Sequence, residues 1–198
     1  MTEAVGPALA IYAELPLAAT EVYSYSLTSA ELGDTSPDAS SHVAFGAGLE
    51  VDLHRYPTGG FVISLGARTL LTRWDQPEPI GAGELHLAVV PEWQSAAPPE
   101  PGAGPRLMAH CGLGVGASLV SLAGGHLVAT SGGAEVTFGT GLWMSARTRV
   151  GFDADFFGGN EGTSTEGTLD DTTAWRMGWT PTRGTLTARV VWVARPPR

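Results

Sequence analysis

The feature that most constrains the fold of this chain is a strict alternation of apolar and polar residues over positions 42–56. Odd-numbered positions from Val43 to Leu53 are all apolar, whereas even-numbered positions hold small, charged or imidazole side chains. Successive side chains of a β-strand point to opposite faces, so a period of two predicts a strand with one apolar and one polar face. A helix would instead repeat its apolar residues every three or four positions.

The alternation resumes over residues 61–74, after the segment Tyr56-Pro57-Thr58-Gly59-Gly60. Proline fixes its own φ and glycine tolerates positive φ, so this segment predicts a hairpin turn. Each run covers about a dozen residues, about twice the usual length of a globular strand. Strands of that length suit a tilted crossing of a membrane.

The same pattern predicts antiparallel strands along most of the chain. Further alternating segments cover residues 6–15, 20–28, 83–93, 106–122, 134–144, 146–156, 172–179 and 184–194. Residues 16–19 and 180–183 have turn-like sequences, which predicts one hairpin at each end of the chain and ten strands in all. If the first hairpin is a single strand or is false, the count falls to eight or nine. We therefore predict an all-β fold, in which an antiparallel meander closes into a barrel of eight to ten strands.

We expect residues 1–198 to form a single domain, because the pattern is the same on both sides of every candidate linker. Within it, residues 1–41 contain the N-terminal hairpin and an acidic loop at 31–41. Residues 94–105 form a proline-rich connection, and residues 158–171 form a long acidic loop.

The positions that alternate with the apolar ones share one face of the strands, which we call the polar parity, and the apolar positions form the apolar parity. The polar parity combines glycines with charged residues of both signs. Its charged members that we assign to the barrel interior, or lumen, are Glu50, Asp52, Arg68, Glu84, Glu135, Arg147, Arg149, Asp153, Asp155, Arg176 and Arg189, with Glu92 on the same parity. Four histidines share this face: His42, His54, His86 and His110. Charges at such close quarters must be paired or hydrated, and we expect Arg147 and Arg149 to pair with Asp153 and Asp155. The glycines fit a crowded inward face, so we predict a charge-laddered interior and an apolar exterior.

At this point the chain resembles the small outer-membrane β-barrels of Gram-negative bacteria, the OmpA-like transmembrane barrels. The segments HVAFGAGLEVDLHRY, LMAHCGLGVGASLVSL and ARTRVGFDADFF carry the resemblance, which covers most of residues 41–194 as a pattern. It implies a bacterial outer-membrane location, a lipid bilayer as partner, and a girdle of aromatic side chains at the membrane interfaces. The candidates for this girdle are Tyr56, Trp74, Trp93, Phe156, Trp179 and Trp192.

Composition excludes several other classes. The formal charge of −9 argues against binding to nucleic-acid phosphates, and the single cysteine, Cys111, excludes an internal disulfide. No apolar run reaches the length of a transmembrane helix. The opening residues MTEAVGPALA lack the charged start and apolar core of a secretory signal. Either the signal has been removed or lost to a wrongly chosen start, or the protein is not exported, which would favour a soluble protein.

A soluble, lipocalin-like barrel that binds a small apolar ligand is therefore an alternative. In such a barrel the apolar parity would face inward and the charges outward, and alternation alone does not distinguish the two polarities. The glycines on the polar parity favour the membrane barrel.

The sequence indicates neither catalysis nor a cofactor. The histidines lie on different predicted strands without metal-ligand spacing, and Asp153, Asp155, Asn160 and Glu161 match no Ca²⁺ loop. No phosphate-binding loop or nucleophile elbow is present. We expect a non-enzymatic protein with no cofactor. Its role would be structural, surface binding through loops 31–41 and 158–171, or passage of very small solutes, with the lumen charges acting in stability or gating.

Overall fold

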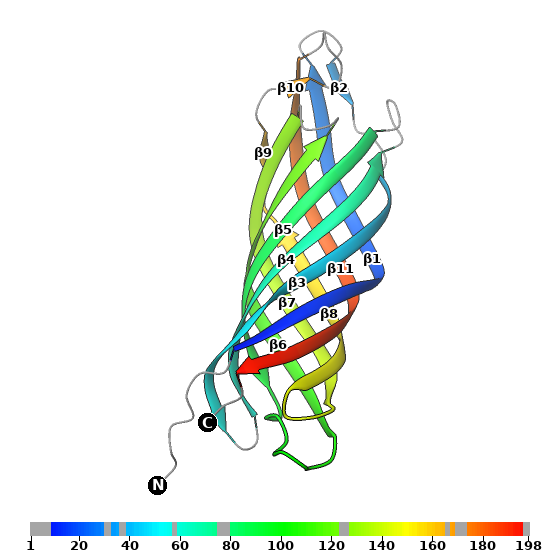
Figure 1. Ribbon diagram of the computed structural model, residues 1–198. Helices are drawn as coiled ribbons and strands as arrows, with labels where there is room; N and C mark the ends of the chain where they lie inside the picture. Colours follow the sequence, from blue (N-terminus) through cyan, green and yellow to red (C-terminus); the bar gives the residue numbers. More distant parts are fainter. Residues whose placement is uncertain are drawn as a thin grey trace.

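The chain folds into a closed antiparallel barrel of eight long strands (Figure 1). The computed structural model describes residues 9–29, 33–35, 39–56, 59–74, 80–122, 127–164, 167–168 and 174–195. The long strands are β1 (Leu9–Ser29), β3 (Ala39–Tyr56), β4 (Gly59–Trp74), β5 (Ile80–Gln94), β6 (Arg106–Leu122), β7 (Leu127–Trp143), β8 (Thr148–Gly159) and β11 (Ala174–Arg195). Each pairs with the next long strand, and β11 pairs with β1 to close the barrel. The prediction of an all-β meander closed into a barrel is confirmed.

Three short strands extend individual ladders at the end of the barrel away from Leu9 and Arg195 (Figure 1). They are β2 (Gly33–Thr35) on β1, β9 (Thr163–Ser164) on β7, and β10 (Gly167–Thr168) on β11. Parts of the two predicted acidic loops thus form strand, residues 160–162 connect β8 to β9, and the other residues of the two loops lie outside the described ranges. None of the described residues forms a helix that is long and apolar enough to cross a membrane.

The predicted terminal hairpins are wrong, because each is one continuous strand. β1 runs through residues 16–19, where a register shift between Pro16 and Ala18 absorbs the proline, and β11 runs through residues 180–183. The two strands pair with each other from Leu9↔Arg195 to Ser29↔Trp175, and this long ladder overrides the local turn sequences. The strand number is therefore eight, the lower limit of the predicted range.

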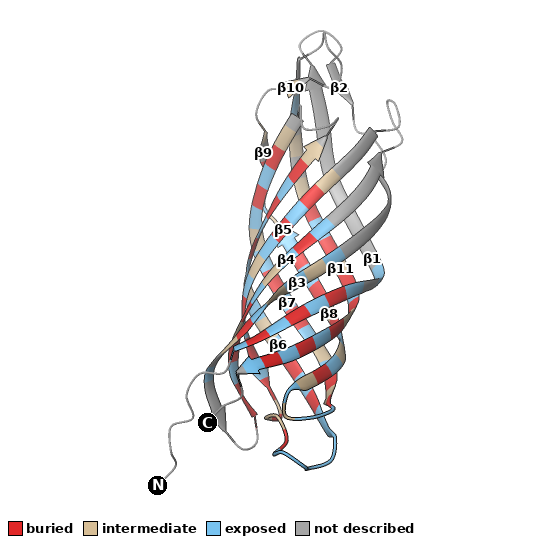
Figure 2. Cartoon of the chain, in the orientation of Figure 1, coloured by how far each residue is buried: buried red, intermediate tan, exposed pale blue. Residues whose placement is uncertain are grey.

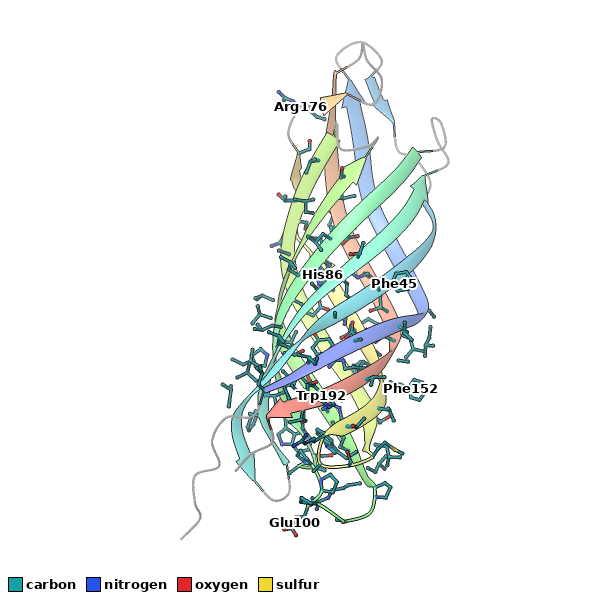
Figure 3. The ribbon with its side chains drawn as sticks, viewed as in Figure 1. Phe45, His86, Glu100, Phe152, Arg176 and Trp192 are labelled. Atoms are coloured by element: carbon teal, nitrogen blue, oxygen red, sulfur yellow. The ribbon has the colours of Figure 1, made fainter. Side chains whose placement is uncertain are left out.

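The described side chains alternate between the inside and the outside along each long strand, as the alternating colours in Figure 2 show. The outward parity is apolar and forms an apolar belt around the barrel. The belt comprises Ile11, Leu15 and Leu17 on β1, Phe45, Leu49 and Leu53 on β3, Phe61 and Leu65 on β4, Leu85, Leu87, Val89 and Trp93 on β5, Leu107, Leu113, Val115 and Leu119 on β6, Val136 and Phe138 on β7, Val150, Phe152 and Phe156 on β8, and Leu186, Val190 and Trp192 on β11. Figure 3 shows Phe152 projecting away from the barrel wall. This polarity is the reverse of that expected for the soluble, lipocalin-like alternative.

Candidate functional site in the barrel interior

The end of the lumen next to Leu9 and Arg195 is filled by an apolar cluster. Its buried members are Ala10, Tyr12, Ala96, Met108, Trp143, Val191 and Val193. Ala96 comes from the connection between β5 and β6, which the Ser95 amide ties to the Ala109 carbonyl at 2.8 Å. The Ala109 amide in turn donates to the Ser95 hydroxyl at 2.8 Å. A loop residue thus packs under the lumen and closes this end.

Above the cluster, Arg68 on β4 joins three carboxylates from three other strands. Its Nε donates to Glu14 on β1 at 2.7 Å, and its Nη2 donates to Asp155 on β8 at 2.7 Å. Its Nη1 lies 3.3 Å from an oxygen of Glu135 on β7. All four side chains are at least nine-tenths buried. The planar five-donor guanidinium suits this role, because it holds carboxylates in several directions at once.

Arg189 on β11 makes a second crossing of the lumen. Its Nη2 donates to Glu14 at 2.7 Å, and its Nε contacts Asp153. Its guanidinium lies over the ring of Tyr12, 4.4 Å from the ring centroid, in a cation–π arrangement. Glu14 is therefore shared by Arg68 and Arg189, so the two crossings form one connected structure.

Further pairs extend this structure towards the apolar cluster. Arg149 donates to Glu50 at 2.6 Å, and His110 Nε2 lies 2.8 Å from an oxygen of Asp153. His110 Nδ1 lies 3.4 Å from Glu92. We call the resulting set the lumen network: Glu14, Glu50, Arg68, Glu92, His110, Glu135, Arg149, Asp153, Asp155 and Arg189.

Towards the other end of the barrel, His86 connects a serine to the lumen network. Its Nδ1 lies 2.7 Å from the Ser118 hydroxyl, and its Nε2 lies 3.0 Å from Glu135. A hydroxyl–imidazole–carboxylate chain is also the arrangement that activates a serine nucleophile. Ser118 is only 2% exposed, however, so its hydroxyl is closed to a substrate here. We assign this chain to the packing of the interior.

The interior is filled rather than open. The described residues bury seven carboxylates, four guanidinium groups and two imidazoles in the lumen. A cavity of about 10 Å³ lies among them, lined by residues that include Tyr12, Arg68, His86 and Arg189. That volume is about the room for one water molecule. A narrow eight-stranded barrel whose interior is packed by its own side chains leaves no bulk channel at this level.

The inward glycines make this packing possible. A Cβ atom at Gly116 would lie 2.6 Å from the His86 ring, and one at Gly66 would lie 2.6 Å from the Tyr12 hydroxyl. Both distances are shorter than a non-bonded contact allows, so these positions must stay small for the neighbouring large side chains to cross the lumen.

Most described members of the predicted charge set point inward. Buried positions are occupied by Glu50, Arg68, Glu84, His86, His110, Glu135, Arg149, Asp153, Asp155 and Arg189. Arg147 and Arg176 are exposed instead, and Figure 3 shows Arg176 at the far end of the barrel. Arg147 lies in the bend that joins β7 to β8, where strand alternation does not apply. The predicted set also contains His42, Asp52 and His54, whose side chains the structure does not describe.

The expected ion pairs differ from those in the structure. Arg149 pairs with Glu50, while Asp153 and Asp155 pair with Arg189 and Arg68. Residues four apart on one strand are about 13 Å from each other, so partners come from other strands across the lumen.

Two interior charges were absent from the predicted set. Glu14 has the parity of the buried Tyr12, and Arg183, which pairs with Glu84 at 2.8 Å, has the parity of Arg189. The turn expected at residues 180–183 concealed the second of these.

Of the predicted girdle, the described side chains are those of Trp93, Phe156 and Trp192. All three are outward-facing and 43%, 49% and 45% exposed. The structure does not describe the side chains of Tyr56, Trp74 and Trp179, so the aromatic girdle remains a prediction. In the described part of the chain, no group of three or more His, Cys, Asp or Glu side chains has a metal-binding arrangement.

Comparison with solved structures identifies the fold. No protein-family model and no curated protein matches the sequence. The outer membrane protein OprG from Pseudomonas aeruginosa superimposes with a TM-score of 0.59 at 11% identity, covering 96% of this chain and 98% of OprG. Neisserial surface protein A gives a TM-score of 0.44 at 14% identity, and the match covers 94% of this chain and 98% of that protein. The outer membrane enzyme PagL gives a TM-score of 0.37 at 15% identity, and the match covers 87% of this chain and 99% of PagL. The chain therefore has the fold of an eight-stranded outer-membrane β-barrel.

Proposed function

We propose that this protein spans a bacterial outer membrane as a sealed barrel, and that it has a structural or surface-binding role instead of forming an open channel. The observation that carries the proposal is the lumen network, which crosses the barrel inside the apolar belt. Charged and apolar side chains alternate on the same strands at that level: Glu14 precedes Leu15, which is 59% exposed, and Glu50 follows Leu49, which is 40% exposed.

The apolar belt supports insertion into lipid. Full burial of a large apolar side chain contributes about 1.5–3 kcal/mol, and exposure to water carries a penalty of part of that amount; the belt leaves such side chains 38–74% exposed on all eight long strands. Lipid removes that penalty, while the closed ladder leaves no strand edge in the hydrocarbon at the level where all eight strands pair.

The sealed lumen directs attention to the end of the barrel that carries β2, β9 and β10. β11 continues beyond the apolar belt at this end with Thr182 and Arg176 exposed, and the short strands β2, β9 and β10 there belong to the acidic segments 31–41 and 158–171 (Figure 1). We propose that surface binding takes place there. Passage of small solutes would require Arg68 and Arg189 to separate from their carboxylates.

Insertion and conductance test the proposal together. The protein should require detergent or lipid to stay monomeric, should migrate differently on a gel before and after heating, and should give no steady conductance in planar bilayers. A monomer that is stable without detergent would contradict the membrane assignment. A stable open current from the wild-type protein would contradict the sealed lumen.

A further inference from the structure

A groove of about 550 Å³ crosses the outer face of the barrel over β5, β6 and β7. Leu85, Leu87 and Leu119 form its apolar sides, and Ala117 and Gly132 form its floor. Its volume lies within the range of about 300–1,000 Å³ that is typical of small-molecule sites.

The groove exists because two small residues face each other across the β6–β7 ladder. Ala117 pairs with Gly132, and Leu87 pairs with Ala117 on the opposite edge of β6. A Cβ atom added at Gly132 would meet its nearest neighbour, the Gly116 carbonyl oxygen, at 3.8 Å. This floor position therefore accommodates a Cβ atom with one ordinary van der Waals contact, in contrast to the crowded inward glycines.

One charged residue, Glu161, lies at the rim of the groove. It follows β8, whose last belt residue is Phe156, and the last belt residues of β5 and β6 on that side are Leu85 and Leu119. Glu161 is exposed and follows Phe156, the last large apolar residue of the belt on β8. The groove thus combines apolar sides from the belt with one exposed carboxylate.

We propose that this groove binds one acyl chain of a membrane lipid whose headgroup carries an ammonium group, and that Glu161 pairs with that ammonium. The inference rests on the proposed membrane insertion, since it requires the outer face to be surrounded by lipid. The apolar sides favour the chain over water, and the carboxylate selects the headgroup. An exposed ion pair of this kind corresponds to about a two- to fivefold preference over an otherwise identical anionic lipid.

Two lipids with the same chains provide the test. Dioleoyl phosphatidylethanolamine and dioleoyl phosphatidylglycerol are titrated into the full chain in an uncharged maltoside detergent, and amide shifts are followed by NMR. Phosphatidylethanolamine should shift the amides of Thr130 and Gly132 at about two- to fivefold lower concentration than phosphatidylglycerol. The amide of Thr140, which is also outward-facing on β7 but lies outside the groove, should respond weakly and equally to both lipids.

Three variants separate the chain contact from the headgroup contact. Gly132→Leu fills the floor and should abolish the response to both lipids, whereas the matched change Thr140→Leu should leave it intact. Glu161→Gln should retain the response to both lipids but remove the preference.

Each contrary result has its own meaning. Equal responses of Gly132 and Thr140 would show an ordinary lipid annulus and overturn the site. A preference that survives Glu161→Gln would overturn the role of that carboxylate. Folding is scored first, by the change in gel mobility on heating. A chain that folds in detergent without the lipid preference refutes only the groove proposal, whereas a detergent-independent soluble monomer refutes the membrane assignment as well.

Discussion

Replacement of Arg68 by alanine should be among the most damaging single changes in the lumen. Arg68 pairs with Glu14, Glu135 and Asp155, whose side chains are 2%, 1% and 3% exposed. Removing the guanidinium leaves three carboxylates in a space with little room for water. Breaking a buried ion pair by removing one partner costs about 3–5 kcal/mol, since the remaining charge is uncompensated. Glu14 keeps its contact with Arg189, so we expect a loss within that range and not a multiple of it.

The assay is equilibrium unfolding in urea of protein inserted into liposomes, with the folded fraction read from gel mobility without heating. Arg147→Ala is the matched control, because Arg147 is also an arginine but is exposed, and its loss should change the free energy of unfolding by less than about 0.5 kcal/mol. Arg68→Lys should fall between the two, because a lysine keeps the charge but not the fork that holds several carboxylates. If Arg68→Ala is as stable as Arg147→Ala, the lumen network does not hold the barrel together and the reasoning is wrong.

Two further changes test the inward and outward faces. Gly112→Ala would put a Cβ atom 2.7 Å from the backbone oxygen of Pro91, so this change should destabilise the barrel by about 1–3 kcal/mol in the same urea titration. A Cβ atom at Gly83 meets nothing within 4 Å, so Gly83→Ala should be neutral or slightly stabilising. Leu113→Arg places a charge at an outward position that is 67% exposed, and near the bilayer midplane it should lower the free energy of unfolding in liposomes by up to about 2–4 kcal/mol. Glu100→Arg, in the exposed connection between β5 and β6, should leave the free energy of unfolding unchanged. Equal stability of these two variants would argue against a lipid-facing belt.

The alternation of the sequence predicted the fold class and which side chains share a face of the wall, because successive residues of a strand point to opposite faces. Val43 to Leu53 are apolar on one parity, and Phe45, Leu49 and Leu53 are indeed exposed on the outside. Alternation alone did not decide which face points outward, and the glycines on the polar face favoured the polarity that the structure has. Their purpose becomes visible only with partners such as His86 over Gly116, which come from different strands.

The terminal strands show where local sequence rules fail. Pro16 and residues 180–183 have the chemistry of turns, yet both lie within the β1–β11 ladder. Closure of the barrel pairs the first strand with the last, and the many backbone hydrogen bonds of that ladder outweigh a local preference of about 1 kcal/mol. No local pattern reveals this closure, so the sequence left the strand count at eight to ten.

The ion pairs were unpredictable for a related reason. The stagger of all strands around the barrel decides which charged residues meet across the lumen, and the sequence of a single strand does not determine that stagger. Arg68 and Asp155 are far apart in the chain and meet only after closure. The polar face was therefore predictable, while its pairing was not.

The most direct test of the central claim, that the apolar parity faces lipid around a sealed polar lumen, uses the single native cysteine. Cys111 is free and exposed on the outer face of β6, within the apolar belt. A nitroxide attached to it in liposomes should be relaxed strongly by oxygen, which concentrates in the hydrocarbon, and weakly by a water-soluble nickel chelate. Strong relaxation by the nickel chelate would place Cys111 in water and contradict the account.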